Sequence, residues 1–209
     1  MEKYILDANL FFNMEAGINM GGKTETVVVS LTEIIRKLHE AKKAEFFMPA
    51  KVVEEFLSFF EDKNQGFIKN FLAVITVKTP ELSQINLSAQ LFSKLIEDIR
   101  SRSYRGMAVA EEEIGRASRL MAGQVDLNKK DFEIKIGSVI RSFRDRYRRA
   151  TRYGFLDSLA DLDLILLSKE QNGFLVTTDE GVASWGRLFG VREMPVVAWR
   201  RRLEDLARS

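Results

Sequence analysis

The sequence predicts an α/β fold with three layers, in which helices cover a parallel sheet and a helical projection is inserted into the core. Short apolar runs alternate along the chain with amphipathic segments of helical period, a pattern that favours parallel strands joined by crossover helices. One long stretch shows helical period only and lies between the second strand and the C-terminal strands. We therefore expect a core made of residues 1–86 and 153–209, with a helical insertion at residues 87–152.

The first part of the core is predicted from its apolar runs and its prolines. The expected elements are, in order, a strand at residues 3–7, a helix from Thr24 to about residue 44, a strand at residues 45–48 and a helix at residues 50–62. Pro49 stops the second strand, and Pro80 breaks whatever element precedes it. Residues 66–86 stay ambiguous between strand and helix.

The remaining elements follow from the same patterns. They are, in order, helices over residues 87–152 with breaks near Gly106 and around residues 123–128, a helix at residues 155–171, a strand at residues 173–178, a short helix at residues 181–189 and a final strand at residues 195–199. The helix at residues 155–171 is apolar around much of its circumference, which predicts that it is buried.

Composition limits the class of protein. A hydrophobic content of 45% is sufficient for a substantial core, and the absence of cysteine excludes disulfides and thiolate zinc sites. No signal-peptide pattern and no apolar run of roughly 20 residues is present, so we expect a soluble, cytoplasmic protein with no membrane partner. Residues 100–152 contain fourteen Lys or Arg against seven Asp or Glu, whereas the remainder is acidic. This asymmetry predicts a polyanion-binding part, although solvated helix faces would explain it equally well.

Four aspartates at separated points of the chain are candidates for one metal site. Asp7 and Asp179 end short apolar runs that are typical of buried parallel strands, whose carboxyl ends form a ligand-binding edge. Asp157 and Asp161 lie four residues apart, so a helix over both places them on one face. Carboxylates beside apolar runs need a compensating partner. In a chain with one histidine and no cysteine, we expect that partner to be Mg²⁺ or Mn²⁺.

Each aspartate also has an ordinary structural interpretation. Asp7 and Asp179 could each cap the turn or helix that follows, and the pair Asp157 and Asp161 could form a polar stripe. The agreement of three separate segments favours the joint site. Asp163 points away from the pair on a helical wheel, so it is a less certain ligand and a candidate for a salt bridge.

A cluster of this kind supports phosphodiester hydrolysis. Two divalent cations about 4 Å apart can bind the attacking water and the leaving oxygen of an in-line displacement. Metal-bound water needs no histidine base, and the single histidine, His39, lies in a charged helical segment typical of a protein surface. Hydrolysis by a Ser/His/Asp triad is therefore poorly supported, and neither a Walker-type loop nor a dinucleotide fingerprint is present.

At these residues the chain resembles the PIN-domain nucleases. The resemblance rests on strand-terminal Asp7 with Asn9 two positions later, on the helix start Pro49-Ala50-Lys51-Val52-Val53-Glu54-Glu55, on Asp161 in an apolar helix and on the strand end Thr177-Thr178-Asp179. The helix acid of that pattern corresponds to Glu55, although Glu54 could take its place. The resemblance implies a PIN-like, that is Rossmann-like, core.

Within the PIN proteins, the chain is similar to the small protein-only ribonuclease P family called HARP, also known as RNA ligase partner proteins. The features that narrow the match are Asp157, the helical insertion and an arginine-rich segment. The resemblance implies metal-dependent removal of the 5′ leader from precursor tRNA and self-association into a large, dodecamer-like ring of dimers. It assigns catalysis and metal binding to Asp7, Asp157, Asp161 and Asp179, with Asp163 and Glu55 less certain. A PIN ribonuclease acting on other RNAs, or a non-catalytic RNA-binding scaffold, stays open as an alternative.

An amphipathic helix rich in arginine is predicted at residues 131–152. Arg141, Arg144, Arg148 and Arg152 fall within an arc of about 80°, opposite an apolar side, and Arg149 lies at the flank. Arginine forks match phosphate oxygens, and an RNA helix is recognised largely through its shape and backbone. We therefore expect these five arginines to bind RNA, with a solvated charged face as the alternative.

Overall fold

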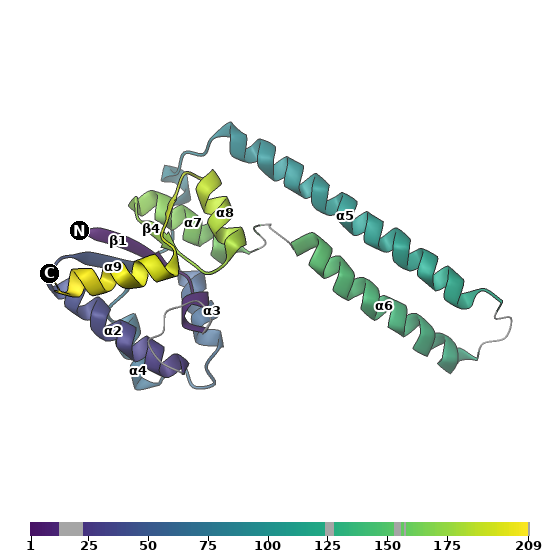
Figure 1. Ribbon diagram of the computed structural model, residues 1–209, viewed down its shortest axis with the longest axis horizontal. Helices are drawn as coiled ribbons and strands as arrows, with labels where there is room; N and C mark the ends of the chain where they lie inside the picture. Colours follow the sequence, from purple (N-terminus) through teal and green to yellow (C-terminus); the bar gives the residue numbers. More distant parts are fainter. Residues whose placement is uncertain (13–22, 124–127, 153–155, 157, 209) are drawn as a thin grey trace. The chain divides into compact units, whose positions relative to one another are not determined.

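The computed structural model describes residues 1–12, 23–123, 128–152, 156 and 158–208. The chain divides into two compact units, one of Met1–Ser88 with Leu156–Ser209 and one of Ala89–Phe155. The first unit contains the sheet, and the second is a helical hairpin (Figure 1). The functions expected for the insertion, namely subunit assembly and RNA contact, stay predictions. None of the helices in these ranges has the length and apolar character needed to cross a membrane.

Five parallel strands form the sheet of the first unit, in the order β3-β2-β1-β4-β5. The strands are β1 (Glu2–Leu6), β2 (Ala44–Met48), β3 (Thr76–Val77), β4 (Phe174–Val176) and β5 (Arg192–Glu193). The predicted α/β class with a parallel sheet is confirmed. β1 is central, and its last residue, Leu6, pairs with Val176, the last residue of β4. The carboxyl ends of these two strands therefore lie side by side.

The central strand is buried on both faces. Tyr4, Ile5 and Leu6 are all fully buried, and consecutive residues of a strand point to opposite faces of the sheet. On one of these faces the ring of Tyr4 contacts the rings of Phe46 and Trp199. Both faces are thus covered, as a parallel sheet requires, and a side chain that follows β1 begins at the rim of an apolar core.

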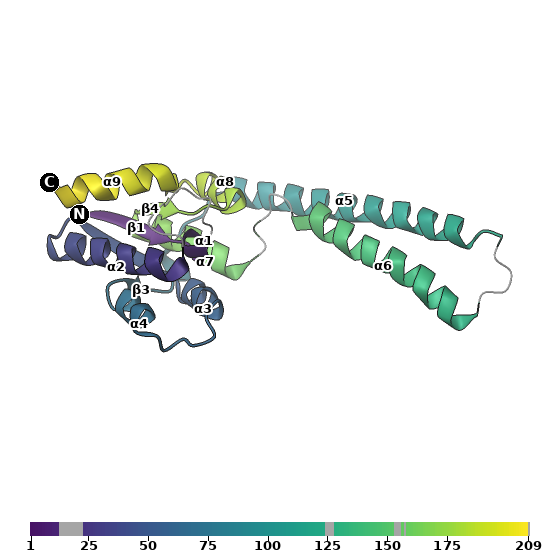
Figure 2. The ribbon, with the colours of Figure 1, turned by 60° about the horizontal axis from the view of Figure 1, so that its bottom comes forward.

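Helices connect the strands of this unit and cover the sheet. They are α1 (Asn9–Phe12), α2 (Thr24–Glu40), α3 (Ala50–Ser58), α4 (Gly66–Leu72), α7 (Leu159–Gln171), α8 (Glu180–Leu188) and α9 (Val196–Arg208). α2 packs against β2, α4 and α9, and α2 and α9 lie side by side in both views (Figures 1 and 2). α7 packs against β1, β4, α3 and α8, so it reaches both central strands. The ambiguous residues 66–86 contain α4, β3 and a short 3-10 helix (Leu82–Gln84).

The final strand predicted at residues 195–199 is wrong, because this segment begins helix α9. The last strand, β5, ends before it. Val196, Trp199 and Leu203 are buried at helical spacing along α9, and charged residues occupy much of the rest of the helix. The apolar run at its start resembles a strand only because the charged residues come after it.

The second unit consists of two antiparallel helices, α5 (Ala89–Met121) and α6 (Lys129–Arg152). α5 continues through Gly106, so the break predicted there is wrong. A Cβ atom at Gly106 would lie 2.6 Å from a ring carbon of Tyr147, a distance that real atoms do not adopt. The glycine therefore leaves room for the Tyr147 ring of α6 against α5, at a modest loss of helix propensity.

A buried polar cluster fixes the register of this hairpin. Glu113 of α5 is 3% exposed and accepts hydrogen bonds from Arg146 (2.9 Å) and Ser142 (3.0 Å) of α6. The Arg146 guanidinium, helped by Ser142, holds the pKa of the Glu113 carboxyl below its usual value. Arg146 thus belongs to the contact between the helices, which separates it from the arginines expected to bind RNA.

Candidate active site at the carboxyl edge of the sheet

Asp7 follows the last residue of β1 and lies at the carboxyl edge of the sheet. Its backbone N–H donates to the carbonyl of Val176 at 3.1 Å, which joins the ends of β1 and β4. Its side chain is buried and accepts hydrogen bonds from the backbone N–H (3.2 Å) and the side-chain amide (3.4 Å) of Asn9. These donors hold the carboxylate in place, but neither of them is cationic.

Thr177 links Asp7 to Asp179. The Thr177 hydroxyl donates to Oδ2 of Asp7 and accepts a hydrogen bond from the backbone N–H of Asp179 at 3.0 Å. Asp179 caps α8, since its Oδ1 accepts from the backbone N–H groups of Gly181 (2.7 Å) and Val182 (3.1 Å). A carboxylate offers about four lone-pair sites on two oxygens, so this cap does not prevent Asp179 from binding a cation as well.

Asp161 lies in the first turn of α7, which begins at Leu159 and not near residue 155 as predicted. The N-cap is Ser158, whose hydroxyl accepts a hydrogen bond from the backbone N–H of Asp161 at 3.0 Å. Asp157 lies outside the described residues, and the described helix begins after it. Ser158 is the N-cap of the described helix, and the expectation that Asp157 shares a helical face with Asp161 stays a prediction.

Glu55 on α3 is a fourth carboxylate of this group. The negative charge of Asp7 acts on Glu55, and the charges of Asp7, Asp179 and Glu55 all act on Asp161. The negative charges of Asp7 and Asp161 therefore act on Glu55, which makes it a candidate member of the site. Four segments of the first unit thus contribute acids to one region.

Burial and repulsion from neighbouring carboxylates raise the pKa values of Asp7, Glu55 and Asp161. Burial, followed by the charge of Asp179, raises the pKa of Asp7, while the hydrogen bonds from Thr177 and Asn9 oppose that rise. Burial, followed by the charges of Asp7, Asp179 and Glu55, raises the pKa of Asp161 to about 6. A divalent cation would remove both causes, because it replaces water as the partner of the charged oxygens and screens their repulsion.

The described acids do not form a closed metal cage on their own. Among the residues that the structure describes, no group of three or more His, Asp or Glu side chains is placed so that it could hold a metal ion. Their donor set nevertheless consists entirely of oxygen atoms, which suits Mg²⁺ or Mn²⁺. Mg²⁺ usually keeps several waters and binds through one or two carboxylates, so it does not require a closed cage.

Asp163 belongs to an ion pair. Its side chain is buried, and Oδ2 accepts a hydrogen bond from Nζ of Lys51 at 2.6 Å. This pair connects α7 to α3, the two helices that carry Asp161 and Glu55. The salt-bridge interpretation of Asp163 is thus the one found. The sequence analysis did not single out Lys51, whose only signal was its place in the first turn of the helix that follows Pro49.

Replacing Lys51 with methionine should destabilise the first unit by about 1–2 kcal/mol. The change leaves the buried Asp163 carboxylate without its cation, which costs about 3–5 kcal/mol where both partners are buried. The Lys51 side chain is 44% exposed, so solvent screening reduces the loss. Denaturant unfolding measures the effect, with the exposed residue change Lys63→Met as the matched control. Equal stability of the two variants would contradict this role.

Replacing Thr177 with valine should slow the RNA cleavage expected from the sequence roughly 10- to 100-fold. This is the usual effect of losing a hydrogen bond that orients a metal-ligating side chain, here that of Asp7. Valine keeps the shape of threonine but can neither donate to Asp7 nor accept from Asp179. Single-turnover cleavage measures the loss, and Thr177→Ser, which retains the hydroxyl, should recover most of it. A serine variant as slow as the valine variant would show that the methyl group matters and the hydrogen bonds do not.

The arginines expected to bind RNA all lie on α6 and all are exposed. They are Arg141, Arg144, Arg148, Arg149 and Arg152. Exposure leaves guanidinium groups accessible to phosphate oxygens, whereas Val139 of the same helix is buried. Their contact with RNA stays a prediction.

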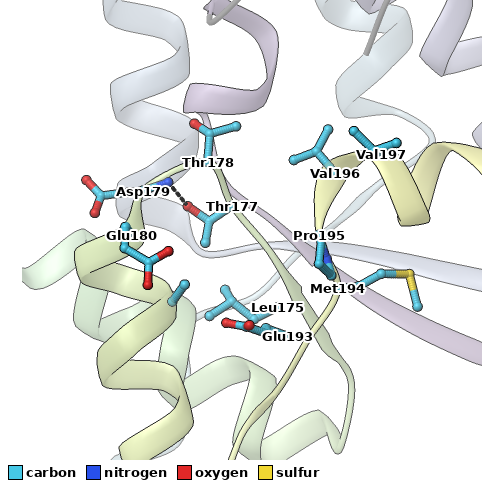
Figure 3. A pocket seen from close by; sticks show the side chains of 11 residues that line it. Leu175, Thr177, Thr178, Asp179, Glu180, Glu193, Met194, Pro195, Val196 and Val197 are labelled. Atoms are coloured by element: carbon cyan, nitrogen blue, oxygen red, sulfur yellow. Dashed lines mark hydrogen bonds between the residues drawn. The ribbon is translucent and has the colours of Figure 1, made fainter. Parts of the chain in front are cut away.

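A pocket of about 340 Å³ opens beside Asp179 (Figure 3). It lies between the start of α8 on one side and the segment from β5 into α9 on the other, with Leu175 of β4 between them. Thr177 and Asp179 line this pocket and also belong to the group of acids and its hydrogen bonds. The pocket therefore lies beside Asp179 and, through Thr177, next to Asp7.

A parallel α/β sheet with acids from its strand ends and helices gathered at the carboxyl edge is the arrangement of a PIN-class nuclease. The chain belongs to the PINc domain ribonuclease family, whose family model matches residues 3–208. The PIN-domain resemblance and the endoribonuclease class expected from the sequence are confirmed.

Within that family, the chain is similar over most of its length to proteins named RNA-free ribonuclease P. It is 35% identical to the protein from Hyperthermus butylicus over 195 residues, which cover 90% of this chain and 81% of the relative. It is 31% identical to the protein from Nitrosococcus oceani over 208 residues, covering 99% and 96%. It is 30% identical to the protein from Pyrococcus furiosus over 206 residues, covering 99% and 94%. The resemblance to the protein-only ribonuclease P family is thus confirmed.

Proposed function

We propose that this protein is an RNA-free ribonuclease P, which removes the 5′ leader of precursor tRNA by hydrolysing one phosphodiester bond and leaves a 5′-phosphate on the mature end. The observation that carries the proposal is the similarity to relatives of that name over as much as 99% of the chain. The acids gathered at the carboxyl edge of the sheet support it, because they supply the oxygen ligands that this hydrolysis needs.

Asp7, Asp157, Asp161 and Asp179, with Glu55, are the residues that we propose to hold Mg²⁺ or Mn²⁺. Such a cation, when bound, lowers the pKa of a water molecule and stabilises negative charge on a leaving oxygen. The chain itself contributes fixed positions for the oxygens. Thr177 and Asn9 orient Asp7, and the Ser158 cap fixes the turn of α7 that carries Asp161. Asp163 is bound to Lys51 and is the weakest candidate ligand.

The RNA substrate is expected to bind in part through the exposed arginines of α6. Their charge favours phosphate, and their spacing of three or four residues along one helix suits a regular row of phosphate oxygens. Contacts of this kind select the A-form shape of an RNA helix and not its sequence. This selectivity suits an enzyme whose substrates share a fold and differ in base sequence.

We also propose that copies of this chain assemble into a large, dodecamer-like ring of dimers, as the family resemblance implies. Large apolar side chains are exposed on the helical hairpin and could supply part of the contact surface. Among them are Phe92, Ile96, Ile99 and Ile114, which are 49–66% exposed. Light scattering after size exclusion measures the mass directly, and a monomer at micromolar concentration would contradict the assembly.

One assay tests the proposed activity. The protein is incubated with Mg²⁺ and a precursor tRNA, and the cut is mapped to the nucleotide. We expect a single cut at the mature 5′ end, and none when EDTA replaces Mg²⁺. Scattered or anticodon cleavage would indicate a PIN ribonuclease with other substrates, and binding without cleavage would indicate a scaffold. Either result would overturn the proposal.

A further inference from the structure

Most of the side chains that line the pocket beside Asp179 have no role in the proposed hydrolysis. Its volume of about 340 Å³ lies at the small end of the range of ligand pockets, which is roughly 300–1,000 Å³. Apolar side chains form much of its wall, namely Leu175, Met194, Pro195, Val196 and Val197, and two acids, Glu180 and Glu193, lie among them. An apolar wall with polar groups at a few positions is typical of a site that binds an organic ring.

Charge limits what can enter this pocket. Asp179, Glu180 and Glu193 all line it, and the Arg187 guanidinium pairs with the last two at 2.6 Å and 2.7 Å. The lining therefore carries a net negative charge, which repels a phosphate group. A neutral nucleobase meets no such repulsion, and the aliphatic side chains of the wall offer it apolar contact.

The place of the pocket beside the acids limits which base this could be. The pocket shares Thr177 and Asp179 with the candidate active site, so an occupant lies beside two residues of the site to which we assign the hydrolysis. A base in an RNA helix loses its stacking and pairing energy when it leaves the helix, whereas an unpaired base can turn outward into a protein pocket. On the 3′ side of the cut the nucleotide belongs to the acceptor stem, and on the 5′ side it belongs to the leader.

We propose that this pocket binds the base of the leader nucleotide immediately 5′ of the bond that is hydrolysed. The inference rests on the proposed function, since it assumes cleavage at the junction of leader and acceptor stem. Holding that base next to Asp179 orients the phosphodiester toward the acids. The pocket is thus a positioning site for the substrate, and its walls touch the base but not the phosphate.

The test compares two precursor tRNAs that differ only at this leader nucleotide, which carries either cytosine or no base. Single-turnover cleavage with wild-type protein and Mg²⁺ gives kcat/KM for each. We expect the abasic substrate to be cut at the same bond but roughly tenfold more slowly, because the base no longer buries apolar surface in the pocket. Equal rates with correct cleavage would overturn the pocket assignment and leave the proposed function intact. Absence of cleavage at the mature 5′ end in both substrates would instead overturn the proposed function and, with it, this inference.

A pair of variants ties the effect to the pocket. Ala183 of α8 lines it, so Ala183→Leu fills part of the space, and leucine is a good helix former. This variant should lose most of the difference between the two substrates. Ala198→Leu makes the same change at an exposed position of α9, outside the pocket lining, and should keep that difference. Retention of the full difference by a folded Ala183→Leu protein, checked by its thermal midpoint, would contradict the assignment.

Discussion

Asp7→Asn is expected to abolish cleavage of precursor tRNA while leaving RNA binding intact. Asparagine keeps the size of the side chain but removes the negative charge that we assign to cation binding. A cation that stabilises the transition state contributes several kcal/mol, so the rate should fall by roughly a thousandfold or more. Single-turnover cleavage measures the loss, and a gel-shift titration measures the affinity for RNA.

The same substitution separates a catalytic role from a structural one. Asp7 is buried and its pKa is raised, so its ionised form opposes folding at neutral pH when no cation is bound. The substituted asparagine carries no charge, and the thermal midpoint in EDTA should therefore not decrease. Mn²⁺ should raise the midpoint of the wild-type protein more than that of the variant. Asp205→Asn, on the exposed side of α9, is the matched control and should behave as wild type. Retained cleavage by Asp7→Asn would contradict the assigned role.

Replacing Arg144 and Arg148 together with alanine should weaken binding of precursor tRNA and flatten its salt dependence. The two side chains lie one turn apart on α6 and are both exposed. Each phosphate contact contributes about 0.7–0.9 to the slope of log affinity against log salt. Loss of two contacts should lower that slope by about 1.5 and the affinity by roughly 10- to 100-fold at about 0.15 M salt. Binding measured at several salt concentrations gives both quantities.

A matched double variant controls for net charge. Lys37→Ala with Lys63→Ala also removes two exposed positive charges, but from the first unit. If α6 contacts the RNA directly, this control should change the salt slope much less. An equal change in both double variants would show that affinity follows the total charge of the protein and not a particular helix. Cleavage at saturating protein should continue in the arginine variant, since none of the candidate metal ligands is altered.

Much of the fold follows from periodicity. Alternating apolar and amphipathic runs predict the parallel sheet, and β1, β2 and β4 lie close to where those runs occur. The errors come from segments in which local pattern competes with packing. From the sequence, Gly106 indicates a helix break. In the structure α5 continues through it, and the Tyr147 ring packs where a Cβ atom would lie. Similarly, the apolar start of α9 resembles a strand because burial of Trp199 depends on a helix that only the completed core specifies.

By itself the sequence determines the kinds of ligand that this protein can offer. Aspartates after apolar runs, no cysteine and one histidine together indicate oxygen ligands at the end of a parallel sheet. Only the tertiary structure decides which acids act together. Asp163 is two residues from Asp161, yet it forms an ion pair with Lys51. Glu55 is distant in the sequence, yet its negative charge acts on Asp161. The physical reason is that side-chain chemistry is local to the sequence, whereas burial and distance between charges depend on how separate elements pack.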